Sequence, residues 1–176
     1  MTQKVLVLNG PNLGRLGRRE PEVYGSTTLA QLIDLCQEWG TGLGLEIEEL
    51  QTNHEGDLID WLNEAADDET PVVLNAGAWT HYSLALYDAC AQLTAPLVEV
   101  HISDPSQRPE EFRHTSVVTP HAIEVIAGQG IDGYRLALER LGATADRTAF
   151  LDDIASNVAL RLREPAGIRA SPARTR

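Results

Sequence analysis

The sequence has little lysine, little cysteine and no long apolar segment. Lys4 is the only lysine among the 176 residues and lies at the start of a predicted strand. Schiff-base chemistry on a lysine amine is therefore not expected. Cys36 and Cys90 lie far apart and form no C-x-x-C motif, which favours two reduced thiols in a cytosolic protein. No apolar run approaches the roughly 18 residues that span a bilayer, and the stretch 5–8 is too short for a signal-peptide core. We therefore expect a cytoplasmic protein without a membrane anchor.

Positive charge is scarce and unevenly placed. The chain carries 14 basic and 26 acidic side chains, a formal net charge of −12, which argues against nucleic acid and against an anionic membrane surface as partners. No Lys or Arg lies between Glu20 and Gln107. Five arginines fall in the segments 15–19 and 108–113. If these segments meet in space, they form a positive pocket suited to a small anionic ligand; the alternative is that the arginines are solvated loop residues.

Short apolar runs alternate with amphipathic segments along the chain. Five segments predict strands. Those at 4–9 and 71–75 are buried, the one at 45–51 alternates imperfectly, and the fourth and fifth lie at 96–102 and 122–127. Four segments predict helices, at 26–39 with Ser26 or Thr27 as the cap, 55–66, 80–93 and 131–141. Strands that alternate with helices indicate a parallel sheet covered on both faces. We predict an α/β fold of the flavodoxin-like, doubly wound, five-stranded type.

The domain organisation follows from the same pattern. We expect one compact catalytic domain over residues 1–144, a length that can bury a sizeable core. Apolar spacing predicts a helical extension over 145–163. Residues 164–176 are rich in Pro, Ala and Arg, which favours disorder.

The predicted topology brings the arginine segments together. In doubly wound sheets, ligands bind beyond the carboxyl ends of the strands, and these ends fall at 9–25, 51–55, 75–81 and 101–113. Both arginine segments therefore lie at one edge of the sheet, which favours the anion pocket over solvated arginines.

The first loop carries Tyr24 close to Arg18 and Arg19. Its glycines form neither G-x-G-x-x-G nor a P-loop, and the loop is typical of a flexible lid. A tyrosine that acts as a base at neutral pH needs a pKa about three units below its usual value, and guanidinium groups stabilise tyrosinate. The alternative is an ordinary loop tyrosine.

Two further loops carry candidate ligands. The fourth predicted strand places Glu99 and His101 on one face, where the carboxylate can orient the imidazole as a general acid; the alternative is a structural pair at the sheet edge. Ser103 and the backbone after it can donate to a carboxylate. Asn75 and the following amides can bind an anion, and His81 is either a ligand contact or a helix-end histidine. No spacing resembles a metal site.

Several motifs, in order, resemble the type II 3-dehydroquinate dehydratase family. They are LNGPNLGRLGRREPEVYG, QTNHEGDLIDWL, LNAGAWTHYSLALYDA, VEVHIS with EEFRHTS, and VIAGQGIDGYRLAL, within residues 4–142. The resemblance implies a flavodoxin-like fold, a homododecamer built from trimers, and a hydro-lyase without cofactor or metal. The reaction would convert 3-dehydroquinate to 3-dehydroshikimate in the shikimate pathway, which leads to chorismate and the aromatic amino acids.

The resemblance also implies roles for the residues that match its motifs on the base side. Tyr24 would take a proton next to the ketone, and Arg19 would keep it as tyrosinate. Arg108 would support this side of the site. Asn12 would hold a water that stabilises the enolate.

On the acid side, the resemblance implies that His101, oriented by Glu99, protonates the departing hydroxyl. Asn75, Ile102 and Ser103 would hold the substrate carboxylate, the last two partly through backbone amides.

Three assignments complete the implied site. His81 and Arg113 would bind ring hydroxyls, and Asp88 would reach the site of a neighbouring subunit. Arg113 is assigned through the EFR motif, because segment 104–111 is one residue longer than the commonest form. The alternative to an enzyme is a non-catalytic flavodoxin-like module that binds a small anion.

Overall fold

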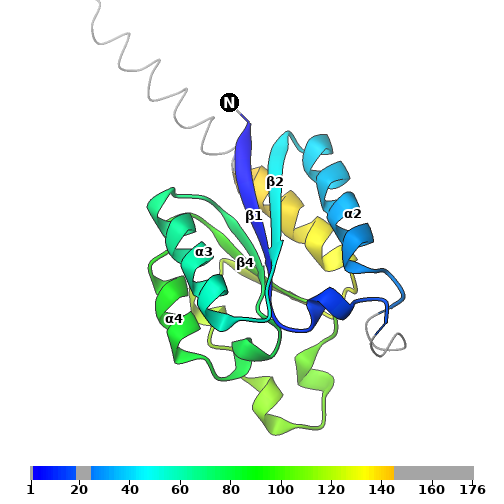
Figure 1. Ribbon diagram of the computed structural model, residues 1–176, viewed down its shortest axis with the longest axis vertical. Coiled ribbons are helices and arrows are strands. Elements are labelled where there is room, and N and C mark those ends of the chain that lie inside the picture. The colour runs from blue at the N-terminus through cyan, green and yellow to red at the C-terminus, as the bar shows by residue number, and fades with distance from the viewer. Residues whose placement is uncertain (1, 19–24, 145–176) are drawn as a thin grey trace, which may run out of the picture. The chain divides into compact units, whose positions relative to one another are not determined.

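The computed structural model describes residues 2–18 and 25–144 (Figure 1). The predictions for Arg19 and Tyr24, and those for 145–163 and 164–176, lie outside these residues. The proposed domain boundary at 144 therefore stays a prediction.

Five parallel strands form one sheet in the order β2-β1-β3-β4-β5. This order confirms the predicted flavodoxin-like α/β fold. The chain adds β2 on one side of β1 and then β3, β4 and β5 on the other side, so the strand order reverses between β1 and β3. The crevice where such folds bind ligands therefore lies between the carboxyl ends of these two strands. The strands are β1 (Gln3–Asn9), β2 (Leu45–Gln51), β3 (Val72–Asn75), β4 (Leu97–His101) and β5 (Glu124–Ala127).

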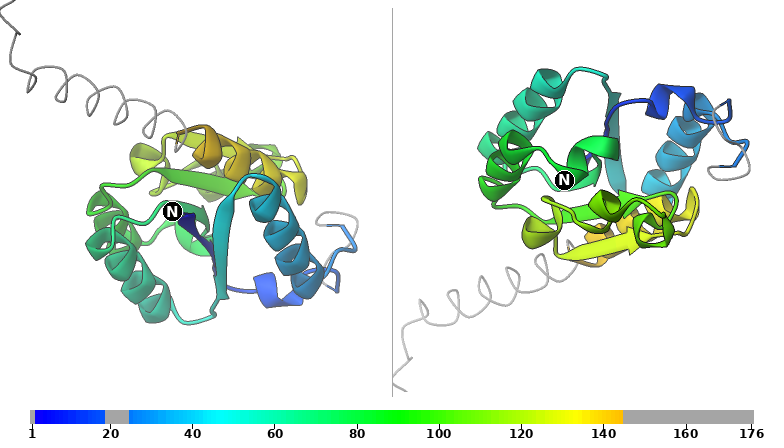
Figure 2. Two further views of the ribbon diagram at one scale, coloured as in Figure 1. Left: turned by 90° about the horizontal axis from the view of Figure 1, so that it is seen from above. Right: turned by 90° about the horizontal axis from the view of Figure 1, so that it is seen from below.

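Helices cover both faces of the sheet (Figures 1 and 2). The helices are α2 (Leu29–Gly42), α3 (Glu55–Asp67), α4 (Leu84–Ala91) and the helical segment 132–144. Val5 and Val7 of β1 pack in the core layer that includes α2 and segment 132–144. Leu6 and Leu8 pack in the opposite layer with α3 and α4, as the period of two along a strand requires. No helix in the described ranges is long and apolar enough to cross a membrane.

Helix α2 differs from its prediction at both ends. Thr28, rather than Ser26 or Thr27, caps it through a capping box with Gln31. The helix also continues through Gly40, which was predicted to end it. A Cβ on Gly40 would lie 2.3 Å from the Ile47 side chain of β2, so this glycine allows the helix to approach the sheet and is not a stop signal.

The helix predicted from Thr80 begins later. Residues Gly77–His81 form a 3₁₀ helix, and α4 starts after Ser83. The Ser83 hydroxyl accepts a hydrogen bond from the Leu86 N–H at 2.9 Å, which is the N-cap interaction. The Thr80 hydroxyl instead donates to Glu99, so the first residue of the predicted helix is part of the site.

Candidate active site

A cavity of about 150 Å³ opens at the carboxyl ends of β1, β3 and β4. Arg15 from the first arginine segment and Arg108 and Arg113 from the second all line it. The two segments therefore meet at one cavity, which supports the anion pocket; Arg18 is exposed and is not part of this wall. The predicted site residues along its wall are Asn12, Asn75, His81, His101, Ile102, Ser103, Arg108 and Arg113.

The other predicted site residues lie elsewhere. Glu99 is behind His101, within β4. Asp88 is an exposed residue of α4 and does not line the cavity of its own chain. Arg15 was predicted as part of the positive pocket without a role of its own, and it lines the cavity.

His101 and Glu99 form the predicted pair. His101 Nε2 lies 2.8 Å from Glu99 Oε1, with the two residues on the same side of β4 and both buried. Because a carboxylate only accepts, Nε2 carries the proton that it donates to Glu99. The other ring nitrogen, Nδ1, is then the atom that can exchange a proton with a ligand in the cavity.

Glu99 is held as a carboxylate although only 1% of it is exposed. Hydroxyl groups of Thr80, Ser116 and Thr119 donate to its oxygens at 2.7, 2.6 and 2.6 Å. Burial raises the pKa of Glu99, but hydrogen bonds from His101, Ser116 and Thr119 outweigh it and lower the pKa to about 2. The ionised carboxylate fixes the orientation of the His101 ring through Nε2, as the proposed general acid requires.

These three hydroxyl residues were missed as site residues from the sequence. Ser116 and Thr119 come from the loop that follows the second arginine segment, and Thr80 comes from the 3₁₀ helix. The sequence does show several hydroxyl residues directly after segment 108–113. Nothing in the local pattern, however, indicates that their side chains contact Glu99.

Replacing Glu99 by glutamine is expected to change how stability depends on pH. The folded protein favours the carboxylate, so this stabilisation is present above the ordinary pKa of 4.5 and is lost as the pH falls towards 2. The shift corresponds to about 3 kcal/mol of unfolding free energy. Urea unfolding between pH 6 and 3 should show the gap between wild type and Glu99→Gln shrinking as the pH falls. A Glu46→Gln control, at an exposed position, should run parallel to wild type. A constant gap for Glu99→Gln would contradict the assignment.

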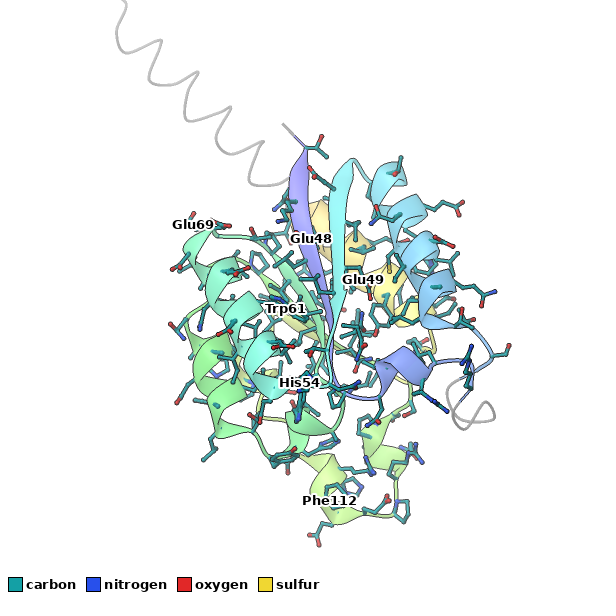
Figure 3. The ribbon with its side chains drawn as sticks, in the orientation of Figure 1. Glu48, Glu49, His54, Trp61, Glu69 and Phe112 are labelled. Carbon is teal, nitrogen blue, oxygen red and sulfur yellow. The ribbon has the colours of Figure 1, made fainter. Side chains whose placement is uncertain are left out.

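His81 and Arg113 form a second polar wall of the cavity. His81 Nδ1 lies 2.8 Å from the Thr115 carbonyl oxygen, so Nδ1 donates and Nε2 is left as an acceptor. Burial lowers the pKa of His81, which favours this neutral form. The Phe112 ring lies between the two residues, 5.0 Å from the Arg113 guanidinium and 6.0 Å from the His81 ring; Figure 3 shows Phe112 at the end of its loop. A neutral acceptor beside a cation suits ligand hydroxyls.

Asn12 has a left-handed backbone, with φ of 68°, which asparagine tolerates better than other non-glycine residues. Its N–H donates to Asn53 Oδ1 at 2.9 Å. Nearby, Gly10 lies against the chain after β3, where an added Cβ would be 2.5 Å from the Ala76 carbonyl oxygen. Asn53, from the motif QTNHEGDLIDWL, therefore fixes the backbone that presents Asn12 to the cavity.

Other nucleophiles lie away from the cavity. Lys4 is at the amino end of β1 and pairs with Glu48 at 2.5 Å. Cys36 and Cys90 are unpaired and buried in opposite core layers, and burial raises the pKa of each thiol to about 12. Among the residues that the structure describes, no group of three or more His, Cys, Asp or Glu could hold a metal ion. The cavity itself offers acid–base and anion-binding groups.

Similarity to known proteins extends over nearly all of the described residues. The family model of dehydroquinase class II matches residues 3–142. A 3-dehydroquinate dehydratase from Salinispora tropica is 61% identical over 142 residues, which are 81% of this chain and 99% of that protein. The corresponding protein of Mycobacterium tuberculosis is 56% identical over 137 residues, 78% of this chain and 92% of that protein. The crystal structure of type II dehydroquinase from Propionibacterium acnes is 54% identical, with a TM-score of 0.79 over 81% of this chain and 98% of that one. The resemblance of the motifs is thus confirmed, and the chain belongs to the class II dehydroquinase family.

Proposed function

We propose that the protein dehydrates 3-dehydroquinate to 3-dehydroshikimate, as a hydro-lyase of the shikimate pathway towards chorismate and the aromatic amino acids. One observation carries the proposal: His101, backed by an ionised Glu99, faces a cavity that three arginines line. The relatives named 3-dehydroquinate dehydratase support this substrate.

The reaction proceeds through an enolate and needs a base, an oxyanion partner and an acid. Tyr24, kept as tyrosinate by Arg19, removes the proton next to the ketone, with Arg108 supporting this side. Asn12 holds the water that stabilises the enolate oxygen. His101 then delivers a proton to the departing hydroxyl, which leaves as water while the ring double bond forms.

The substrate carboxylate is held by Asn75 and by the backbone amides of Ile102 and Ser103. This end of the cavity lies at the carboxyl ends of β3 and β4. His81 and Arg113 bind the ring hydroxyls, through the neutral Nε2 acceptor and the guanidinium. Protein side chains and backbone amides fill every role named here, and the proposed mechanism uses neither a metal nor a cofactor.

A single assay separates this enzyme from a non-catalytic module that binds a small anion. Purified protein is mixed with 3-dehydroquinate, and the absorbance of the conjugated product is followed against the same mixture without protein. Absorbance should rise in proportion to protein concentration. Calorimetric binding of 3-dehydroshikimate without any rise in absorbance would instead identify a non-catalytic binding module.

We also propose a cytoplasmic homododecamer made of trimers. Large apolar side chains are exposed on or just before α4 and β5, and we call them the α4–β5 patch: Tyr82, Leu84, Tyr87, Ile123 and Val125. Leu84 is 75% exposed, and the Tyr87 ring contacts His121 in the segment before β5, with ring centroids 4.4 Å apart. Exposed apolar side chains of this kind support an interaction surface. Asp88 is an exposed residue of the same helix, and we propose that it reaches the cavity of the subunit that packs here.

Light scattering should give a mass of about 230 kDa, from twelve chains of 19.2 kDa. Leu84→Glu places a charge in the α4–β5 patch and should dissociate the assembly, with kcat/KM falling at least about tenfold because Asp88 is lost to the neighbouring site. Leu43→Glu, at another exposed leucine at the end of α2, should leave the mass unchanged. A fully active Leu84→Glu monomer would refute the role of Asp88.

A further inference from the structure

A chain of hydrogen bonds leads from the cavity wall into the core. Asn75 Nδ2 donates to the Tyr134 hydroxyl at 2.9 Å, and that hydroxyl donates to Asn9 Oδ1 at 2.6 Å. Asn9 Nδ2 in turn donates to Glu49 Oε1 at 2.7 Å. The four residues come from β3, the helical segment 132–144, β1 and β2, and only Asn75 lines the cavity.

The direction of the chain is fixed from its cavity end. The Gly77 N–H lies 3.2 Å from Asn75 Oδ1 and can only donate. Asn75 therefore turns Nδ2 towards Tyr134, whose oxygen accepts and whose single proton must go to Asn9 Oδ1. Asn9 then presents its own Nδ2 to Glu49, the final acceptor. No amide in the chain can turn over without breaking two hydrogen bonds.

These polar side chains occupy core positions that apolar residues could fill instead. Asn9 and Tyr134 are fully buried, and Asn75 is 4% exposed. Burial raises the pKa of Tyr134, so it stays a neutral hydroxyl that donates one proton. Glu49 follows Leu45 and Ile47 on the α2 side of β2, opposite Glu48 (Figure 3), and its half-buried carboxyl has a raised pKa because of that burial. Buried polar groups cost stability unless they are paired. The stability of the fold therefore gives no reason for placing this chain of hydrogen bonds in the core.

We propose that Tyr134 is a positioning residue for substrate binding, which with Asn9 and Glu49 holds Asn75 so that its second Nδ2 hydrogen faces the substrate. The inference rests on the proposed function. One Nδ2 hydrogen is used by Tyr134 and Oδ1 is occupied by Gly77, so the remaining hydrogen is the donor that Asn75 offers to a ligand oxygen.

The main test is Tyr134→Phe, which keeps the ring and removes only the hydroxyl. Asn75 then loses the acceptor that fixes its amide. The KM for 3-dehydroquinate should rise about tenfold with kcat changed less than about threefold, because the contact is equally present in the bound substrate and the transition state. Leu138→Val is the control, because Leu138 is buried in the same helical segment but takes no part in the hydrogen-bond chain. It should lower the melting temperature without changing KM.

A double variant separates positioning from general damage. In an Asn75→Ala background, Tyr134→Phe should change kcat/KM by less than about twofold, because it acts through Asn75. A tenfold loss in that background, or an unchanged KM for Tyr134→Phe alone, would overturn the inference. A crystal structure of Tyr134→Phe should show the Asn75 amide in more than one orientation, a readout that needs no activity.

Glu49 provides a variant at a half-buried position, in case Tyr134→Phe does not fold. Glu49→Leu removes the last acceptor and should raise KM about threefold, whereas Glu49→Gln keeps an acceptor oxygen and should restore the wild-type KM. Equal KM values for Glu49→Leu and wild type would overturn the part assigned to Glu49. Wild-type protein that fails to convert 3-dehydroquinate refutes the proposed function, while active wild type with an unchanged Tyr134→Phe refutes only this inference.

Discussion

Replacing His101 by alanine is expected to lower kcat for 3-dehydroquinate about 10³-fold, with KM changed by less than about threefold. The hydroxyl that leaves the ring is a poor leaving group unless it is protonated as the bond breaks. His101 is placed for this transfer because Nε2 is fixed by Glu99, 2.8 Å away, which leaves Nδ1 for the substrate. The loss should therefore appear in the chemical step and not in binding.

His54→Ala is the matched control for this prediction. His54 precedes α3 (Figure 3) and is not part of the cavity wall, so its removal should leave kcat within about twofold of wild type. Product binding, measured by calorimetry, should be nearly the same for wild type and His101→Ala. If His101→Ala turns over at the wild-type rate, another group protonates the hydroxyl and the role proposed for the Glu99 pair is wrong.

Replacing Tyr24 by phenylalanine should abolish turnover while binding is retained. The change removes one oxygen, the atom proposed to take the proton next to the ketone, and a missing base costs on the order of 10²–10⁴ in kcat. The ring remains, so the dissociation constant of 3-dehydroshikimate should change less than about threefold. The absorbance assay and calorimetry on the same preparation measure the two effects.

Thr41→Val is the corresponding control, because it removes a hydroxyl at an exposed position of α2 that is not in the cavity wall. Its activity should equal that of wild type. Unchanged turnover in Tyr24→Phe would overturn the base assignment, and loss of product binding would show that Tyr24 acts in recognition instead.

Much of the fold was predictable because local sequence patterns identify its strands. The run Val5–Leu8 is apolar at every position, as expected of a strand between two helical layers. The edge strand β2 instead alternates apolar residues with glutamates over part of its length. The ends of helices were less predictable, because Gly40 reads as a stop in sequence but serves a close approach to Ile47 that only the tertiary structure reveals.

The cavity was predictable to the extent that loop residues follow strand ends. Three arginines from the two segments, His81 after β3 and His101 at the end of β4 line it together, as the topology requires. The partners of Glu99 and Asn75 were not predictable in this way. Tyr134 counts as one more apolar position in an amphipathic helix, and its contact with Asn9 joins residues 125 positions apart, which no local periodicity encodes.

The central claim is that this cavity, at the carboxyl ends of β1, β3 and β4, carries out the dehydration. A crystal structure of the wild-type protein with 3-dehydroshikimate tests it most directly. We predict the product carboxylate against Asn75 and the amides of Ile102 and Ser103, with His101 Nδ1 within about 3.2 Å of the site of the lost hydroxyl, directly or through one water. Product bound at another surface, or with its ring turned away from His101, would contradict the account.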